Sequence, residues 1–61
     1  MYLLKYYLKD KILKTYFIGE DELHKIISHF KYYDVNIIKK DNLITIKEDN
    51  WNKIEIIKKD I

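Results

Sequence analysis

One stretch of this chain has the period of an α-helix, and it lies between two stretches in which apolar residues alternate as they do in strands. From Leu23 to Tyr33 the apolar residues recur three and four positions apart, which places them along one stripe of a helix. The acidic run 20–22 after Gly19 is typical of a helix N-terminus, with Gly19 as the cap and Glu22 reaching back to the cap amide. This pattern restricts the chain to folds in which one helix packs against strands.

The segment before the helix predicts a β-hairpin, because two runs rich in Leu, Ile, Tyr and Phe flank Asp10 and Lys11 with the period of a strand. With a two-residue turn at Asp10 and Lys11, the face expected to form the core consists of three cross-strand pairs: Leu8 with Leu13, Tyr6 with Thr15, and Leu4 with Phe17. The opposite face mixes charged, aromatic and aliphatic residues: Lys5, Tyr7, Lys9, Lys14 and Tyr16, beside Leu3, Ile12 and Ile18. A register slip of one residue would exchange these faces.

The segment after the helix predicts a second hairpin, in which residues 35–40 and 43–48 flank a turn at Asp41 and Asn42. Asn tolerates a positive φ angle, so this turn is better specified than the first. The predicted apolar face consists of Val35, Ile37, Ile44 and Ile46. The other face again mixes lysine with apolar groups: Asn36, Ile38, Lys40, Leu43, Thr45 and Lys47.

Residues 51–61 fit either a strand or a short helix. Three β-branched residues within four positions, Ile54, Ile56 and Ile57, favour the strand. A three-residue loop at positions 49–51 would align Ile54 and Ile56 with Ile46 and Ile44. We therefore expect an α+β two-layer sandwich in the order β-β-α-β-β-β, with an antiparallel sheet of four to five strands and the helix on one face.

The size of the chain predicts one small domain, residues 1–61, close to the lower limit of independent stability. There is no Cys to form a disulfide or a thiolate metal site, so oligomerisation is the remaining common way of burying more surface. No apolar run approaches the roughly 18 residues that span a bilayer, and the first residues lack a signal-peptide core. We expect a soluble cytoplasmic protein that associates with itself, most simply as a homodimer, without a membrane partner.

The charges exclude a strong electrostatic field around the whole molecule. Lysine supplies all 12 basic residues and ten carboxylates offset them, which leaves a net charge of +2. Without arginine, any contact with nucleic acid would be mostly to phosphate, because arginine is the side chain best suited to reading guanine. The heavy use of Ile, Lys, Tyr and Asn indicates an AT-rich coding genome, such as that of a low-GC bacterium or its phage.

No arrangement of residues predicts catalysis, a metal or a cofactor. His24 and His29 are five residues apart, about 140° around a helix, so they do not face one metal ion. Glu20 with His24 has better spacing but is an incomplete ligand set, and Ser28 lacks the sharp turn that presents a nucleophile. For Trp51, the only Trp, we favour a place in the core over a role as a partner's anchor.

Three hypotheses remain for the mixed faces of the hairpins, and the blandest is a sheet surface that contacts only solvent. In the leading hypothesis the chain is a non-catalytic, self-associating protein-binding module, specifically a phage or mobile-element inhibitor of a host defence protein. Its expected protein interface is Leu3, Tyr7, Ile12, Tyr16, Ile18, Ile38 and Leu43. In the alternative the same side binds nucleic acid, with lysines on phosphates and tyrosines stacked on bases. Those residues are Lys5, Tyr7, Lys9, Lys14, Tyr16, Lys40 and Lys47.

Overall fold

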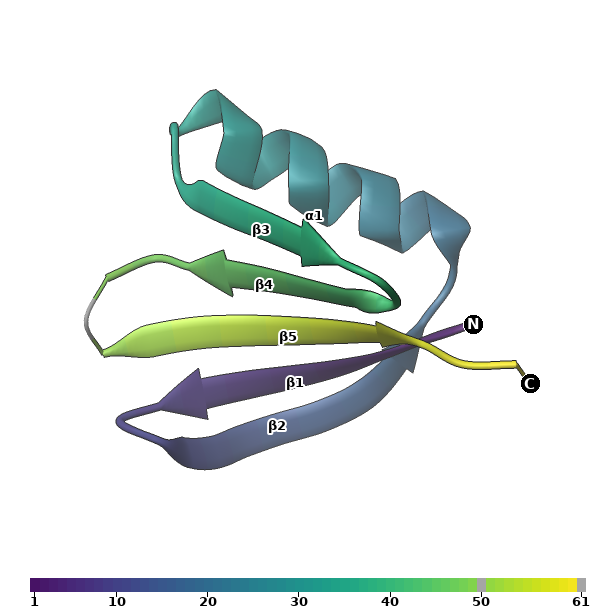
Figure 1. Ribbon diagram of the computed structural model, residues 1–61, viewed down its shortest axis with the longest axis horizontal. Helices are drawn as coiled ribbons and strands as arrows, with labels where there is room; N and C mark the ends of the chain where they lie inside the picture. Colours follow the sequence, from purple (N-terminus) through teal and green to yellow (C-terminus); the bar gives the residue numbers. More distant parts are fainter. Residues whose placement is uncertain (50, 61) are drawn as a thin grey trace.

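The computed structural model describes residues 1–49 and 51–60, which form a five-stranded antiparallel sheet and one helix. The elements are, in chain order, β1 (Tyr2–Leu8), β2 (Lys11–Ile18), α1 (Glu20–Tyr32), β3 (Asn36–Lys40), β4 (Leu43–Lys47) and β5 (Asn52–Lys58). This confirms the predicted α+β class and the order β-β-α-β-β-β. Across the sheet the strands lie in the order β2-β1-β5-β4-β3, so β2 and β3 form its edges (Figure 1).

Strand β5 joins the two hairpins into one sheet, because it pairs with β1 on one side and with β4 on the other. Ile54 lies opposite Ile46, and Ile56 lies opposite Ile44, as predicted. Between β4 and β5, Asp49 Oδ1 accepts hydrogen bonds from the backbone amides of Trp51 at 2.7 Å and Asn52 at 2.8 Å. Position 50 of the predicted loop lies outside the described residues, as does position 61.

Both ends of α1 are formed by the backbone. The Leu23 amide donates to the Gly19 carbonyl at 3.1 Å, and among the described residues the cap has no side-chain hydrogen bond, so the expected role of Glu22 is not met. At the other end Asp34 has a φ angle of 57°, and the Val35 amide donates to the Phe30 carbonyl at 3.0 Å. This is a Schellman motif, and it leads the chain directly from α1 into β3.

The core lies between α1 and one face of the sheet. Its buried members are Leu4, Ile18, Leu23, Ile46, Ile54 and Ile56. From the predicted helical stripe, Ile26, Ile27 and Phe30 pack against this cluster, whereas Tyr33 is exposed. The helix runs along β3, so the opposite edge of the sheet is not covered by it (Figure 1).

The register of the first hairpin differs from the prediction. The turn residues are Lys9 and Asp10, whose φ angles of 51° and 67° suit a primed two-residue turn, so the turn lies one position earlier than expected. The register also shifts between Tyr6 and Tyr7, where Leu13 is the extra residue of a bulge on β2. The resulting pairs are Leu4 with Tyr16, Lys5 with Thr15, and Tyr6 with Lys14. Residues 14–18 therefore lie on the opposite faces to those predicted, because side chains alternate along a strand.

The second hairpin has the predicted register. Ile37 lies opposite Ile46, and Ile38 lies opposite Thr45, so the predicted division into an apolar and a mixed face is confirmed. The turn at positions 41 and 42 is also as expected, but the residue with the positive φ angle, 53°, is Asp41 rather than Asn42. Asp tolerates this conformation for the same reason as Asn, since its short polar side chain bonds to nearby backbone.

Candidate interaction surfaces

The face of the sheet opposite α1, called the outer face from here on, has no covering layer among the described residues. Three rows of neighbouring side chains cross it from β2 to β3. The first, called the apolar row, is Phe17, Leu3, Ile57 and Leu43, followed by Lys40 on β3. The second is Thr15, Lys5, Glu55, Thr45 and Ile38. The third is Ile12, Tyr7, Lys53, Lys47 and Asn36.

Most of the predicted protein-interface residues share the outer face, but two do not. Those on the outer face are Leu3, Tyr7, Ile12, Ile38 and Leu43. Ile18 instead belongs to the core, where its side chain is only 1% exposed. Tyr16 is exposed on the other side of the sheet, beside Leu4. Both corrections follow from the slipped register of β2, which reversed the faces of residues 14–18.

The predicted nucleic-acid residues are likewise divided. Four of them, Lys5, Tyr7, Lys40 and Lys47, lie on the outer face. Lys9 is in the first turn, whereas Lys14 and Tyr16 lie on the helix side of β2. The continuous lysine and tyrosine lattice expected along the first hairpin is therefore wrong. Lys53 and Glu55 also lie on the outer face, and sequence reasoning missed them because it assigned only the apolar face of the last strand.

Exposed apolar side chains gather on β2. Ile12, Leu13, Tyr16 and Phe17 are between 46% and 55% exposed, and every residue of this strand before Ile18 is exposed. They occupy both sides of the strand, since Ile12 and Phe17 lie on the outer face and Tyr16 lies on the helix side. Phe17 also continues the apolar row, so the exposed groups of β2 merge with those of the outer face. A group of neighbouring exposed apolar side chains is typical of an interaction surface, whereas single exposed apolar residues are normal on any protein.

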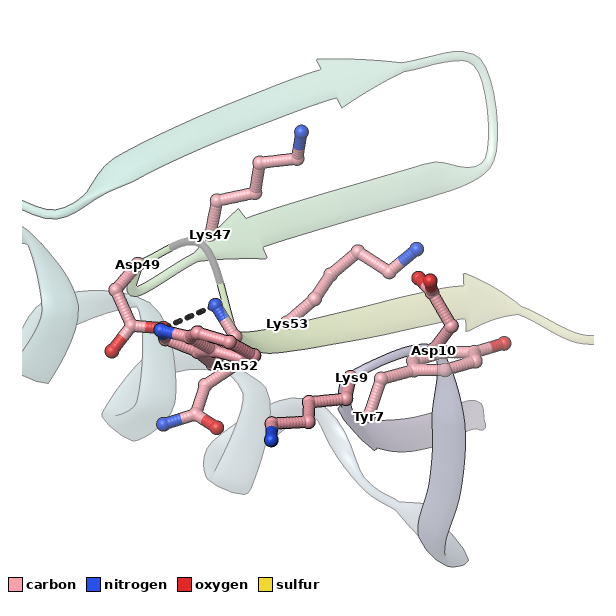
Figure 2. A pocket seen from close by; sticks show the side chains of 8 residues that line it. Tyr7, Lys9, Asp10, Lys47, Asp49, Asn52 and Lys53 are labelled. Atoms are coloured by element: carbon pink, nitrogen blue, oxygen red, sulfur yellow. Dashed lines mark hydrogen bonds between the residues drawn. The ribbon is translucent and has the colours of Figure 1, made fainter.

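A pocket of about 350 Å³ lies where the first turn meets the end of the second hairpin (Figure 2). Its lining residues are Tyr7, Lys9, Asp10, Lys47, Asp49, Trp51, Asn52 and Lys53. The Lys9 amide donates to the Trp51 carbonyl at 2.8 Å, which ties the turn to the loop. In the part of the chain that the structure describes, Asn52 Oδ1 is buried without a hydrogen-bond partner.

Two lysines of this pocket lie over aromatic rings. The Lys9 ammonium is 4.4 Å from the centre of the Trp51 ring, and the Lys53 ammonium is 4.6 Å from the centre of the Tyr7 ring. Trp51 is 56% exposed, so the favoured prediction that it belongs to the core is wrong. Figure 2 shows the Lys47 ammonium on the far side of the pocket from that of Lys9, so the positive groups surround the pocket and do not converge on one point.

Tyr7, Lys53 and Glu55 form a small electrostatic cluster on the outer face. Lys53 Nζ lies 3.8 Å from Glu55 Oε2, and both side chains are partly buried. The pKa of Tyr7 is raised above its ordinary value. The largest cause is a side-chain hydrogen bond to Glu55, followed by desolvation and by the charge of the Glu55 carboxylate. Lys53 therefore contacts an aromatic ring and a carboxylate together, which holds its ammonium close to the sheet.

The histidines and carboxylates do not form a catalytic or metal-binding arrangement among the described residues. No group of three or more His, Cys, Asp or Glu residues converges there. Glu20 does meet His24, with 3.6 Å between Oε2 and Nε2, but the pair is exposed, and Glu20 also accepts a 2.9 Å hydrogen bond from the Tyr2 hydroxyl. This bond is the main cause of a raised pKa for Tyr2, with smaller effects from desolvation and from the Glu20 charge.

Comparisons with known proteins add no relative to this description. The part of the chain that the structure describes contains no helix long and apolar enough to cross a membrane. No protein-family model, no curated protein and no solved structure matches the chain.

Proposed function

We propose that this chain is a non-catalytic protein-binding module that associates with itself, with a homodimer as its basic form. The observation that carries the proposal is the gathering of exposed apolar side chains on β2 and its continuation into the apolar row. Single exposed apolar residues are normal on any protein. A contiguous group of them favours association, because binding a partner removes all of its apolar surface from water at once.

The small core supports the same conclusion. Among the described residues six are buried, which is few for a sheet of five strands, and the helix covers one face of that sheet. A domain of this size buries only about 60% of the surface its unfolded chain exposes, so it gains more from a second copy than a larger domain does. Self-association would add buried apolar surface where the fold itself supplies least, along β2.

The outer face is the surface that we propose for a different protein partner. It places the apolar row beside a row that contains Lys5 and Glu55, and such a mixture of apolar and polar groups is typical of non-obligate interfaces. That this partner is a host protein, inhibited by a product of a phage or mobile element acting in the host cytoplasm, stays a prediction. The genes that neighbour this one would test it, because they separate defence, replication and toxin contexts.

Sedimentation equilibrium tests the self-association directly. Across low to high micromolar concentrations the protein is expected to shift from monomer to dimer. Phe17→Asn should weaken the dimer, whereas Tyr32→Asn should not, because Tyr32 is 82% exposed at the end of α1, away from the β2 group. A protein that stays monomeric at high micromolar concentration, with both variants behaving like the parent, would contradict the proposal.

Binding of single-stranded nucleic acid is a second candidate, and the pocket is the observation that favours it. The pocket brings the predicted residues Tyr7, Lys9 and Lys47 together with Lys53 and Trp51. Lysines beside exposed aromatic rings are the groups that hold phosphates and stack on unpaired bases.

Fluorescence anisotropy with a labelled single strand at low salt tests this candidate. Binding should weaken steeply with added salt. The logarithm of the association constant should fall against the logarithm of the salt concentration with a slope of roughly 0.7 for each phosphate contacted. Lys47→Gln should reduce affinity, whereas Lys11→Gln, which changes the same charge outside the pocket, should have a smaller effect. If neither a single strand nor a duplex binds at low salt, this candidate is excluded.

A further inference from the structure

We propose that two copies of the chain pair edge to edge through β2, antiparallel and around a two-fold axis at Thr15. Their sheets would then form one continuous sheet, with an outer face shared by both copies. This inference rests on the self-association proposed above and specifies its geometry. A different geometry, in which the outer faces of two copies pack against each other, is the alternative that the tests below distinguish from edge pairing.

The two edges of the sheet differ in how well they can accept another strand. β2 has eight residues. Along the edge that points away from β1, alternate backbone N–H and C=O groups have no neighbouring strand. β3 has only five residues and runs beside α1 (Figure 1). β2 is therefore the edge that is open to pairing.

The side chains of β2 favour a strand as its neighbour over a second sheet. Phe17 and Ile12 are exposed on the outer face, while Tyr16 is exposed on the helix side. A second sheet packed on the outer face would cover Phe17 and Ile12 and leave Tyr16 in water. A strand added beside β2 places side chains next to all three, because its residues alternate between the same two sides.

The sequence of β2 selects both the partner and the register. A two-fold axis at Thr15 places Thr15 opposite its own copy, Lys14 opposite Tyr16 of the second copy, and Leu13 beside Phe17 of the second copy. Lys14 then lies against an aromatic ring, and Leu13 lies against the apolar ring of Phe17. A two-fold axis at Lys14 would instead oppose two ammonium groups.

The bulge does not block this register. Bulges protect edges by bending them, but this one is at Leu13, close to the turn. From Lys14 to Ile18 the pairing with β1 is regular, so the part of β2 around Thr15 and Phe17 keeps the geometry of an ordinary strand. Pairing at Thr15 sets residues 14–16 of the two copies against each other, all within this regular part, and reaches the bulge only at the Leu13 and Phe17 pair on either side.

Cysteine cross-linking tests the geometry, and the chain is suited to it because its described residues contain no Cys. Thr15→Cys would bring two thiols opposite each other across the two-fold axis, at Cα separations of about 4.5–5.5 Å that a disulfide accepts. The matched control is Thr45→Cys, which places a thiol on the outer face in the same row of side chains. Copper-catalysed oxidation by dissolved oxygen should cross-link T15C rapidly and T45C slowly.

Cross-linking of T45C at the same rate as T15C, or faster, would overturn edge pairing and favour packing of the outer faces. Sedimentation of the charge variants T15K and T45K gives an independent result. The concentration for half-dimerisation should rise by about fivefold or more for T15K, since it opposes two ammonium groups across the axis, and should change little for T45K. Circular dichroism confirms that each variant is folded.

The outcomes separate this inference from the function on which it rests. If the parent protein is monomeric at high micromolar concentration, the proposed self-association and the edge pairing both fail. If the parent forms dimers that T15K leaves intact, only the edge pairing fails, and the dimer must use another surface.

Discussion

The two edges of the sheet belong to similar hairpins, yet they have different surroundings. β3 lies beside α1 and contributes Ile37 to the layer that packs on the core. β2 contributes only Ile18, its last residue, and leaves the rest of its side chains exposed. A hairpin of suitable length and apolar content therefore does not guarantee burial, because the helix covers only one part of a five-stranded sheet.

The end of α1 explains which edge is covered. The hydrogen bond from the Val35 amide to the Phe30 carbonyl turns the chain back immediately, so β3 begins beside the helix that precedes it. β2 also adjoins α1 in sequence, through Gly19, but its strand runs at the far edge of the sheet (Figure 1). The tight turn after Phe30 thus places α1 beside the second hairpin, whereas β2 is the open edge.

The largest expected difference between the two hairpins is in stability. Ile46, which is 0% exposed on β4, should cost about 2–5 kcal/mol of unfolding free energy when it is changed to Ala, because the change leaves a cavity. Leu13→Ala on β2 should change the stability of the monomer by less than about 0.5 kcal/mol. Urea unfolding at low protein concentration measures both.

Because a 61-residue domain is only marginally stable, the expected cost of Ile46→Ala is large enough to leave too little folded protein to titrate. The milder Ile46→Val then keeps the comparison measurable, with an expected cost of about 0.5–1.5 kcal/mol. A cost for Leu13→Ala equal to that for Ile46→Ala would show that β2 is part of the core after all.

The turns give the next largest effect. Asp10 and Asp41 have φ angles of 67° and 53°, a conformation that disfavours residues with a Cβ atom. Changing either residue to Gly should therefore raise the unfolding free energy, by roughly 0.5–1 kcal/mol once the added flexibility of the unfolded chain is offset. Thermal unfolding measures this, and Asp21→Gly, inside α1, is a control that should instead destabilise by a similar amount.

The turns also show how much of the fold follows from the sequence. The helical stripe, the second hairpin and the last strand have patterns that agree with their local turn signals, so their positions and pairings were predicted correctly. For the first hairpin the alternating pattern fits more than one register, because apolar residues occur on both faces of β2. The turn at Lys9 and Asp10 and the bulge at Leu13 decide between registers, and neither has a strong sequence signal.

The candidate surfaces depend on that register. Leu3, Tyr7, Ile38 and Leu43 were placed correctly because their strands were, whereas Ile18 and Tyr16 were misplaced with the second half of β2. The pocket at Trp51 could not be predicted, since it forms only when β1 and β5 pair and bring the first turn against the last loop. No local pattern encodes that pairing of two strands from opposite ends of the chain.

The smallest expected effect concerns two tyrosines. Carboxylate partners raise the pKa of Tyr2 and of Tyr7 in the folded protein, so the folded state holds these protons more tightly than the unfolded state does. Their contribution to stability is fully present below about pH 10, the ordinary pKa, and is lost as the pH rises through the folded values.

Tyr7→Phe and Tyr2→Phe should therefore each reduce the alkaline loss of stability, measured by urea unfolding at a series of pH values from neutral upward. Tyr32→Phe at the exposed end of α1 is the control and should leave the pH dependence unchanged. An alkaline loss that is the same in all three variants would show that these carboxylate contacts do not stabilise the fold.

Amide hydrogen exchange across a concentration series tests the central claim most directly, that β2 is the open edge through which copies associate. In β2, amides that point away from β1 should exchange freely in the monomer and become protected as the protein concentration rises, whereas amides of β3 should show no such change. Protection that rises in β3 instead, or exchange in β2 that is fast at every concentration while dimers form, would contradict the account.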